Sequence, residues 1–334
     1  MDIGVLGAGT WGIALAKLLC ENRHRVTVWS ALPEEIEWLS GGHEHKNLPG
    51  VKLPRGIEYT ADIEKALGAD FVLFAVPSAF VRSTVRAASP FLREGQIIID
   101  AAKGMESETL FTMTEVIADE MKKCGCTFEP KLVALSGPTH AEEVAIGMPT
   151  SVVCACSDEE CAQSAASLFM NSCMRVYTNT DVKGVELCGA LKNIIALASG
   201  MSTGMGYGDN TRAMLITRGI AEMTRMGLAM GCKRRTFMGL AGIGDLIVTC
   251  TSQHSRNNRC GEYIGRGMTY KEASEKVGMV VEGYYALEAA VELSRKYGEP
   301  LPIISAVYDV VMNGRKPEDA LDALMTRAMR SELD

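Results

Sequence analysis

Short apolar runs alternate with amphipathic stretches through the first half of the chain. The runs are rich in Val and Ile and almost continuously apolar, and they cover residues 2–7, 25–30, 71–76, 96–102 and 131–137. This pattern is typical of parallel strands that are covered by helices on both faces. We therefore expect a parallel sheet in which a crossover helix connects each strand to the next.

Each of these runs is followed by a stretch with helical spacing. The first predicted helix begins near Thr10, and the next ones cover 33–40, 78–88, 108–121 and 140–147. Two further strand-like runs, 150–157 and 174–180, flank one more helical segment.

The second half has a different character. From about Asp181 the strand-like runs nearly vanish and long helical stretches replace them, over 182–201, 211–230, 283–298 and 304–313. We predict an α/β chain with an N-terminal Rossmann-like, doubly wound domain (1–180) and an all-helical C-terminal domain (181–334). Since no low-complexity linker separates them, the two domains are expected to share a broad interface.

Composition narrows the possible classes. The 334 residues carry a net charge of −7, so no global attraction to nucleic acid or to an anionic membrane is expected. No apolar run approaches the roughly 18 residues that a bilayer crossing needs, and no secretory leader is recognisable. The eleven cysteines are an odd number scattered along the chain, which indicates free thiols in a reducing cytosol and a cytoplasmic protein.

The sequence favours no metal site. The closest cysteine pairs, Cys124/Cys126 and Cys154/Cys156, are not CxxC motifs. His43 and His45 could hold a metal in principle, but a solvated glycine-flanked loop is the favoured interpretation.

A glycine fingerprint follows the first predicted strand. Gly7, Gly9 and Gly12 form GxGxxG between a strand and a helix, where Gly7 would permit a tight turn, Gly9 close approach to a pyrophosphate, and Gly12 close packing of helix on strand. The pattern favours a turn that binds NAD or NADP. The alternative is a tight βα turn without a ligand. The residue after the second strand, Ser30, is neither acidic nor basic, so the choice between the two cofactors stays open.

Polar residues follow several predicted strands. Lys103 comes after one strand and the segment 136–140 (SGPTH) after the next, at the edge where ligands of open α/β sheets bind. Lys103 is either an anion ligand or a solvated loop residue. The run Ser255-Arg256-Asn257 offers a hydroxyl, a guanidinium and an amide that suit a phosphate, or else a solvated polar loop.

A lysine lies on an apolar helical face. Cys188, Ile195 and Ala196 are the helical neighbours of Lys192. The amine either snorkels to water along apolar surface or lies in a cleft, where desolvation lowers its pKa towards neutrality and lets it transfer a proton. Asp245 is either the N-cap of a helix or the partner of such a lysine.

Several motifs, taken together and in this order, resemble one family. They are GAGTWG, VPSAFVR, AAKGME, SGPTHAEEVA, GALKNIIALASG, GIGDLIVTCTSQHSRN and VVEGYYA, and they run from the N-terminus to past Glu282. The chain resembles the NAD(P)-dependent glycerol-3-phosphate dehydrogenases of the soluble bacterial type.

The resemblance implies roles for particular residues. Lys192 would be the catalytic acid and base, with Asp245 as its catalytic partner. The substrate-binding residues would be Lys103, Gly137, Thr139, Lys192, Asp245, Ser255, Arg256 and Asn257. The cofactor-binding residues would be Gly7, Gly9, Thr10, Trp11, Gly12, Ser30, Phe80, Lys103, Ala141, Arg256, Val280 and Glu282. Many relatives carry a basic residue just after the tryptophan that ends the second strand, whereas Ser30 follows Trp29 here.

The resemblance also implies a reaction and a partner. NAD(P)H would reduce dihydroxyacetone phosphate to sn-glycerol 3-phosphate, supplying glycerol phosphate for phospholipid synthesis, in a homodimeric enzyme. The alternatives are a two-domain reductase of a 2-keto acid, such as a ketopantoate reductase, which would not need the Ser-Arg-Asn phosphate site, and an NAD(P)-binding sensor without catalytic activity.

Overall fold

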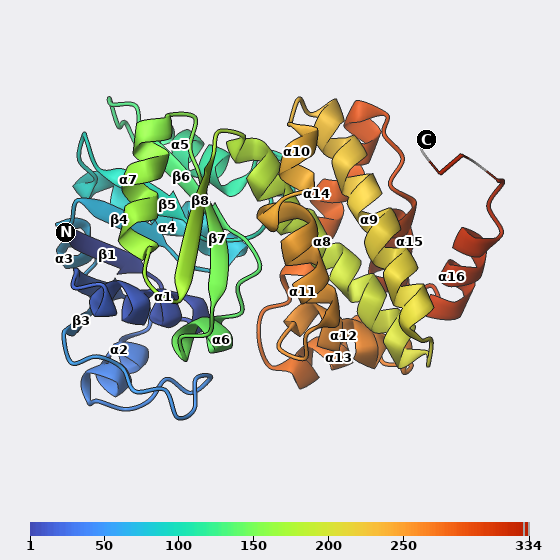
Figure 1. The fold of residues 1–334 in the computed structure, drawn as a ribbon, viewed down its shortest axis with the longest axis horizontal. Coiled ribbons are helices and arrows are strands. Elements are labelled where there is room, and N and C mark those ends of the chain that lie inside the picture. Colours follow the sequence, from blue (N-terminus) through green and yellow to red (C-terminus); the bar gives the residue numbers. More distant parts are fainter. Residues whose placement is uncertain (330, 333–334) are drawn as a thin grey trace.

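A computed structural model describes residues 1–329 and 331–332, so the last part of the predicted helical domain, residues 330, 333 and 334, lies outside the described residues. A sheet with helices on both faces forms the N-terminal part, and a cluster of helices packs beside it (Figure 1). The predicted α/β architecture is confirmed.

The sheet has eight strands in the order β3-β2-β1-β4-β5-β6-β7-β8. All neighbouring pairs are parallel except β6 and β7, so the last two strands run against the other six. The strands are β1 (Asp2–Leu6), β2 (Arg25–Trp29), β3 (Ile57–Thr60), β4 (Phe71–Phe74), β5 (Ile97–Asp100), β6 (Lys131–Ser136), β7 (Thr150–Ala155) and β8 (Met174–Asn179).

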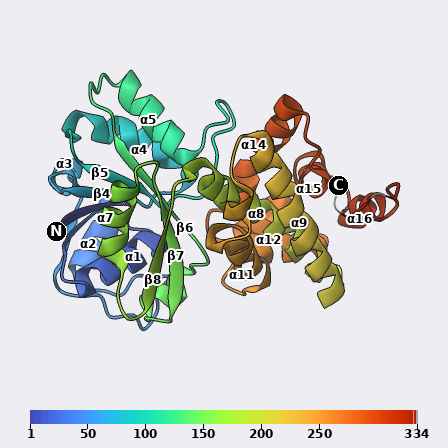
Figure 2. The ribbon, with the colours of Figure 1, turned by 45° about the horizontal axis from the view of Figure 1, so that its top comes forward.

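Successive side chains along the strands point alternately into two apolar cores, one on each face of the sheet. Val5 and Leu73 point to the face covered by α1, α6 and α7, and Leu6 and Phe74 point to the face covered by α3, α4 and α5. Figure 2 shows α4 and α5 on one side of the sheet and α1 and α2 on the other. These helices are α1 (Thr10–Glu21), α2 (Pro33–Ser40), α3 (Ile63–Leu67), α4 (Val81–Ala88), α5 (Met113–Lys123), α6 (Ala141–Ala145) and α7 (Glu159–Phe169).

Four features of this part were not predicted. Strand β3 and helix α3 were missed, because β3 is a four-residue edge strand with one buried side chain, Ile57. The antiparallel direction of β7 was also missed. Helix α5 begins at Met113 and not at Glu108, since Thr112 and Glu115 form a capping box that starts the helix there.

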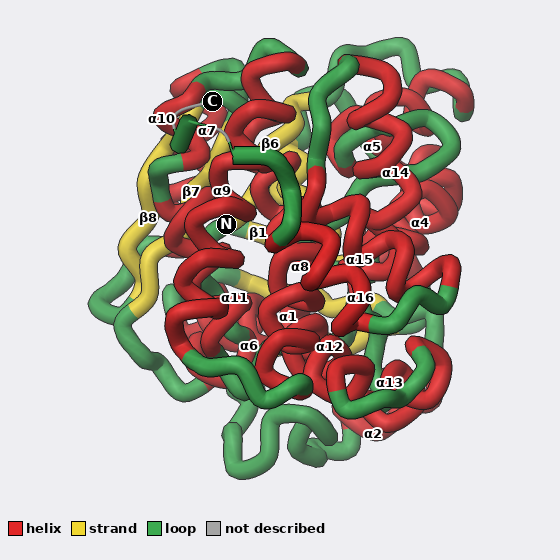
Figure 3. Tube along the Cα trace, turned by 90° about the vertical axis from the view of Figure 1, so that its right-hand side faces the viewer, coloured by secondary structure: helices red, strands yellow, loops and turns green. Residues whose placement is uncertain are grey.

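The C-terminal part is built around one long buried helix. Helix α8 (Val182–Gly204) is surrounded by α9, α11, α12, α14 and α15 (Figure 3). The other helices are α9 (Asp209–Ala229), α10 (Arg234–Phe237), α11 (Asp245–Thr251), α12 (Arg256–Gly265), α13 (Tyr270–Val277), α14 (Glu282–Tyr297), α15 (Pro302–Asn313) and α16 (Pro317–Met325). In the part of the chain that the structure describes, no helix combines the length and apolar character of a membrane span.

The two parts are in direct contact. Val185 of α8 packs with Ala134 of β6 and Val153 of β7. The Asp181 carboxylate caps α8 through the Gly184 N–H and also accepts a hydrogen bond from Thr236 Oγ1 at 2.6 Å. The start of α8 is therefore packed against the sheet through Val185 and tied to α10 through Asp181.

Glycines allow α8 and α12 to pack backbone against backbone. A Cβ atom on Gly200 would lie 2.0 Å from the Asn258 carbonyl oxygen, and one on Gly261 would lie 2.2 Å from the Leu197 carbonyl oxygen. This close approach places α12 beside the C-terminal half of α8.

We expect Gly261→Ala to destabilise the protein by about 1–3 kcal/mol, because overpacking the helix contact outweighs the gain in helix propensity. Thermal unfolding measures the effect. The matched control is Gly68→Ala at an exposed C-cap, where the nearest atom lies 3.4 Å from the new Cβ and the backbone is right-handed. A Gly261→Ala variant as stable as the control would contradict the close packing of α8 and α12.

Candidate active site

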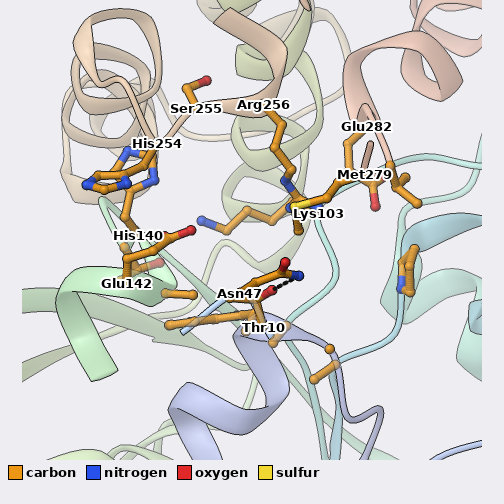
Figure 4. A pocket seen from close by; sticks show the side chains of 18 of the residues that line it. Thr10, Asn47, Lys103, His140, Glu142, His254, Ser255, Arg256, Met279 and Glu282 are labelled. Atoms are coloured by element: carbon orange, nitrogen blue, oxygen red, sulfur yellow. Dashed lines mark hydrogen bonds between the residues drawn. The ribbon is translucent and has the colours of Figure 1, made fainter. Parts of the chain in front are cut away.

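A deep cleft lies between the sheet and the helical part. Its volume is about 400 Å³, within the roughly 300–1,000 Å³ of small-molecule sites in proteins. The residues after β1, β4, β5 and β6 line one side, and α8, α11, α12 and the start of α14 line the other (Figure 4). The cleft is therefore a ligand site to which both parts of the chain contribute side chains.

The glycine fingerprint forms the turn from β1 into α1 at the floor of the cleft. Gly7 has φ +121°, which other residues rarely adopt, and a Cβ on Gly12 would lie 2.1 Å from the Gly7 carbonyl oxygen. Gly9 differs, because a Cβ there would meet no atom within 4 Å and would project into the cleft. Protein packing requires Gly7 and Gly12, whereas Gly9 leaves space that a ligand can fill. This observation fits a dinucleotide pyrophosphate at the N-terminus of α1.

Polar groups beside the turn are available to a ligand. The Trp11 Nε1 atom is buried at the cleft without a hydrogen-bond acceptor. Asn47 Nδ2 donates to Thr10 Oγ1 at 3.2 Å across the floor (Figure 4). On the opposite wall, the Glu282 carboxylate accepts hydrogen bonds from the main chain and side chain of Ser78.

Lys192 is buried in the middle of α8 and faces the cleft. Only 5% of the residue is exposed. Its Nζ donates to Asp245 Oδ1 at 2.5 Å and to Thr249 Oγ1 at 2.8 Å. The snorkelling interpretation is therefore excluded, because the amine is held inside the protein by two partners.

Asp245 bridges two lysines. Its Oδ2 accepts a hydrogen bond from Lys103 Nζ at 2.8 Å, and Lys103 also donates to the Gly137 carbonyl oxygen at 2.9 Å. Asp245 begins α11 directly after a π-helical turn (Leu240–Gly244), and its side chain caps no backbone N–H. The N-cap interpretation is therefore wrong, and Asp245 is the ionic partner of both lysines.

Burial and charge act against each other in this cluster. Burial lowers the pKa of Lys192 to about 8, and the attraction of Asp245 offsets only part of that effect. Burial alone would raise the pKa of Asp245, but the two lysines together hold it below its ordinary value. At neutral pH one carboxylate thus faces two ammonium groups, which leaves one positive charge for an anionic ligand.

The run Ser255-Arg256-Asn257 forms the start of α12 at the cleft. The Ser255 hydroxyl caps the helix by accepting the Asn258 N–H at 3.2 Å. The Asn257 amide donates to Asn193 Oδ1 and accepts the Gly283 N–H, so it ties α12 to α8 and α14. Arg256 points into the cleft toward Lys103 and Met279 (Figure 4). The helix N-terminus and the guanidinium together form a site for an anion.

The cleft collects most of the predicted site residues. The predicted residues that line it are Gly9, Thr10, Trp11, Lys103, Thr139, Ala141, Lys192, Asp245, Ser255, Arg256, Asn257, Val280 and Glu282. The others lie beside it. Gly7 and Gly12 shape the turn below, Gly137 contributes its carbonyl oxygen to Lys103, Ser30 lies behind Glu35, and Phe80 is 55% exposed outside the lining.

Several cleft residues were missed by sequence reasoning. Thr249 lies one helical turn after Asp245 in α11, and that spacing could have predicted its contact with Lys192. Asn193 donates to the Lys103 carbonyl oxygen, which a sequence pattern does not reveal. His140 was named within the segment 136–140, but its proximity to His254, with ring centroids 5.7 Å apart, was not predicted.

The loop after α2 is only partly the solvated loop that was expected. His43 is exposed and stacks on Trp38, with ring centroids 4.1 Å apart. His45 is buried and hydrogen bonded to the Ala8 main chain inside the glycine turn, so that part of the expectation is wrong. Among residues 1–329 and 331–332, no three His, Cys, Asp or Glu side chains are grouped to hold a metal ion.

Comparison with known families covers nearly the whole chain. A model described as NAD-dependent glycerol-3-phosphate dehydrogenase N-terminus matches residues 2–162, and one described as NAD-dependent glycerol-3-phosphate dehydrogenase C-terminus matches residues 181–322. Among curated proteins, glycerol-3-phosphate dehydrogenase (NAD(P)+) 2 of Lactobacillus delbrueckii subsp. bulgaricus is 56% identical over 332 residues, which cover 99% of this chain and 98% of the relative.

Solved structures agree with these matches. The crystal structure of glycerol-3-phosphate dehydrogenase from Coxiella burnetii has a TM-score of 0.92 and 33% identity, covering 97% of this chain and 98% of that chain. A ketopantoate reductase from Ralstonia eutropha JMP134 has a TM-score of 0.61 and 17% identity over 96% of this chain and 100% of that chain, a likeness in fold alone.

Proposed function

Because the chain belongs to the NAD-dependent glycerol-3-phosphate dehydrogenase family, we propose that it reduces dihydroxyacetone phosphate reversibly to sn-glycerol 3-phosphate with NAD(P)H. The observation that carries this proposal is one cleft that contains both the glycine turn and the buried Lys192–Asp245–Lys103 cluster. A nicotinamide dinucleotide supplies the hydride when bound, and the chain's own residues must place the ketone and provide the proton.

The start of α12 would anchor the substrate phosphate. The first N–H groups of a helix have no intrahelical acceptor, and the helix dipole favours an anion there. Arg256 adds a guanidinium that matches phosphate oxygens, and Ser255 and Asn257 hold the helix end in place. Binding at the phosphate, away from the reacting carbon, would then position the ketone.

Lys192 would act at the ketone oxygen. Negative charge develops on this oxygen during reduction, and the Lys192 ammonium would stabilise it and donate the proton. Asp245 and Thr249 hold the amine in position, and Lys103 keeps Asp245 ionised. In the oxidation of glycerol 3-phosphate the neutral Lys192 amine would accept the same proton from the C2 hydroxyl.

The absorbance of NAD(P)H tests this function. Initial rates are measured with each cofactor against dihydroxyacetone phosphate, dihydroxyacetone and ketopantoate. We expect rapid oxidation of the cofactor with the phosphorylated ketone only. Faster reduction of ketopantoate would favour the keto-acid reductase, and binding of NADH without any ketone-dependent absorbance loss would favour the non-catalytic sensor.

The lowered pKa of Lys192 predicts opposite pH dependences for the two directions. Reduction needs the ammonium, so its kcat is expected to fall as the pH rises through about 8, whereas oxidation needs the amine and is expected to rise there. Asp245→Asn removes the attraction that raises the pKa of Lys192, so both limbs should move to lower pH. Profiles of kcat against pH in both directions measure this. Limbs that stay in place in Asp245→Asn would argue that another group carries the proton.

The two parts of the chain would bind different ligands. We propose that residues 1–180 hold the dinucleotide and that residues 181–334 carry the substrate and the catalytic lysine. The position of the glycine turn in the first part and of Lys192, Asp245 and Arg256 in the second supports this division. The family resemblance further supports a cytoplasmic homodimer, and light scattering on the purified protein tests the dimer as twice the mass of one chain.

A further inference from the structure

An acidic side chain lies at the end of β2, where the sequence has the uncharged Ser30. Glu35, in the first turn of α2, turns back onto this position, and Ser30 Oγ donates to Glu35 Oε2 at 2.8 Å. Ser30 in turn accepts the Leu32 N–H at 3.2 Å, and its side chain is buried. In dinucleotide-binding folds, the residue at the end of this strand contacts the 2′-position of the adenosine ribose.

Glu35 belongs to the wall of the cleft. It lines the same space as Gly9 and Thr10 of the glycine turn, and it is half-buried. His45 is hydrogen bonded to the Ala8 main chain within that turn. Burial lowers the pKa of His45, and the nearby negative charge of Glu35 raises it in part. The carboxylate therefore lies beside the predicted pyrophosphate site and not on the outer face of α2.

We propose that Glu35 selects NAD(H) over NADP(H). An ionised carboxylate at this place accepts a hydrogen bond from the 2′-hydroxyl of the ribose and repels a 2′-phosphate. The inference rests on the proposed function only in that the chain must bind a nicotinamide dinucleotide. It assigns to Glu35 the recognition that Ser30 alone cannot provide.

One cation near this end of the cleft acts in the opposite direction. Lys46 also lines the cleft and would attract a 2′-phosphate. However, Lys46 is exposed, so water and salt screen its charge, whereas Glu35 is half-buried and held by Ser30. The carboxylate therefore dominates the discrimination.

Equilibrium binding to the whole protein tests the inference without any substrate. NADH and NADPH are titrated against tryptophan fluorescence, for which Trp11 in the cleft is a reporter. Wild type should bind NADH at least about ten-fold more tightly than NADPH, and Glu35→Gln should tighten NADPH binding by about ten-fold or more while weakening NADH binding only slightly. Ser30→Ala, which removes the hydroxyl that donates to Glu35 but keeps the charge of the carboxylate, should reduce the discrimination less.

A matched control removes the same charge one residue away. Glu34 is exposed and does not line the cleft, so Glu34→Gln should leave both dissociation constants unchanged. Equal changes in the two variants, or unchanged discrimination in Glu35→Gln, would overturn the inference, as would NADPH binding that is tighter in wild type and is lost in Lys46→Gln. Reduction of dihydroxyacetone phosphate is assayed in parallel. Turnover without discrimination by Glu35 refutes only the inference, and discrimination without turnover refutes only the proposed function.

Discussion

Replacing Lys192 with alanine is expected to lower kcat for the reduction of dihydroxyacetone phosphate by about 10²–10⁴, the usual contribution of a positioned general acid. The structure gives the reason. The Lys192 amine is buried, is fixed by Asp245 and Thr249, and is the side chain of α8 that combines a lowered pKa with a position in the cleft. No water molecule can replace a proton donor that is oriented in this way without a loss of rate.

Two measurements separate this effect from unfolding. NADH binding and thermal unfolding are recorded for Lys192→Ala and for Lys192→Met, which keeps more of the volume. Lys183→Ala is the matched control, because Lys183 is on the same helix but pairs with Glu115 outside the cleft. Near-normal turnover of Lys192→Ala, with intact NADH binding, would show that the acid is another group.

Arg256→Ala is expected to raise KM for dihydroxyacetone phosphate by about 10- to 100-fold, which corresponds to the loss of a charge-assisted hydrogen bond of roughly 1.5–3 kcal/mol. The KM for NADH should rise less, because the proposed dinucleotide site lies at the glycine turn, at the other end of the cleft. Initial rates with each substrate varied in turn give both constants.

The control for this charge is at the other end of the same helix. Arg266 follows the last turn of α12 and pairs with Glu262 on the surface, so Arg266→Ala should leave both KM values unchanged. An Arg256→Ala enzyme with unchanged KM for both substrates would remove the anchoring role from Arg256.

Strands with a continuous apolar run were predictable from the sequence, whereas β3, which lacks such a run, was missed. Buried runs such as Phe71–Phe74 and residues 97–99 show continuous apolar character because helices cover both faces of the sheet. Strand β3 lacks such a run, since it lies at the edge. The direction of β7 depends on how the chain returns after α6, and no residue pattern within β7 encodes this.

The residues of the site also divide into those that the sequence predicts and those that it does not. The glycine turn and Ser255-Arg256-Asn257 are local patterns, so their residues were identified by spacing or by resemblance. The surroundings of Lys192 were not predictable from α8 alone, because its partner Asp245 comes from α11, 53 residues later. Glu35 was missed for the same physical reason: a side chain from α2 fills a place that belongs to the end of β2.

The most direct test of the account is a crystal structure of the protein with NAD+ and glycerol 3-phosphate bound together. We expect the Lys192 Nζ atom within about 3.2 Å of the C2 oxygen, with the phosphate at the start of α12 beside Arg256. A C2 oxygen that faces a different proton donor, with Lys192 still paired only to Asp245 and Thr249, would contradict proton transfer by Lys192.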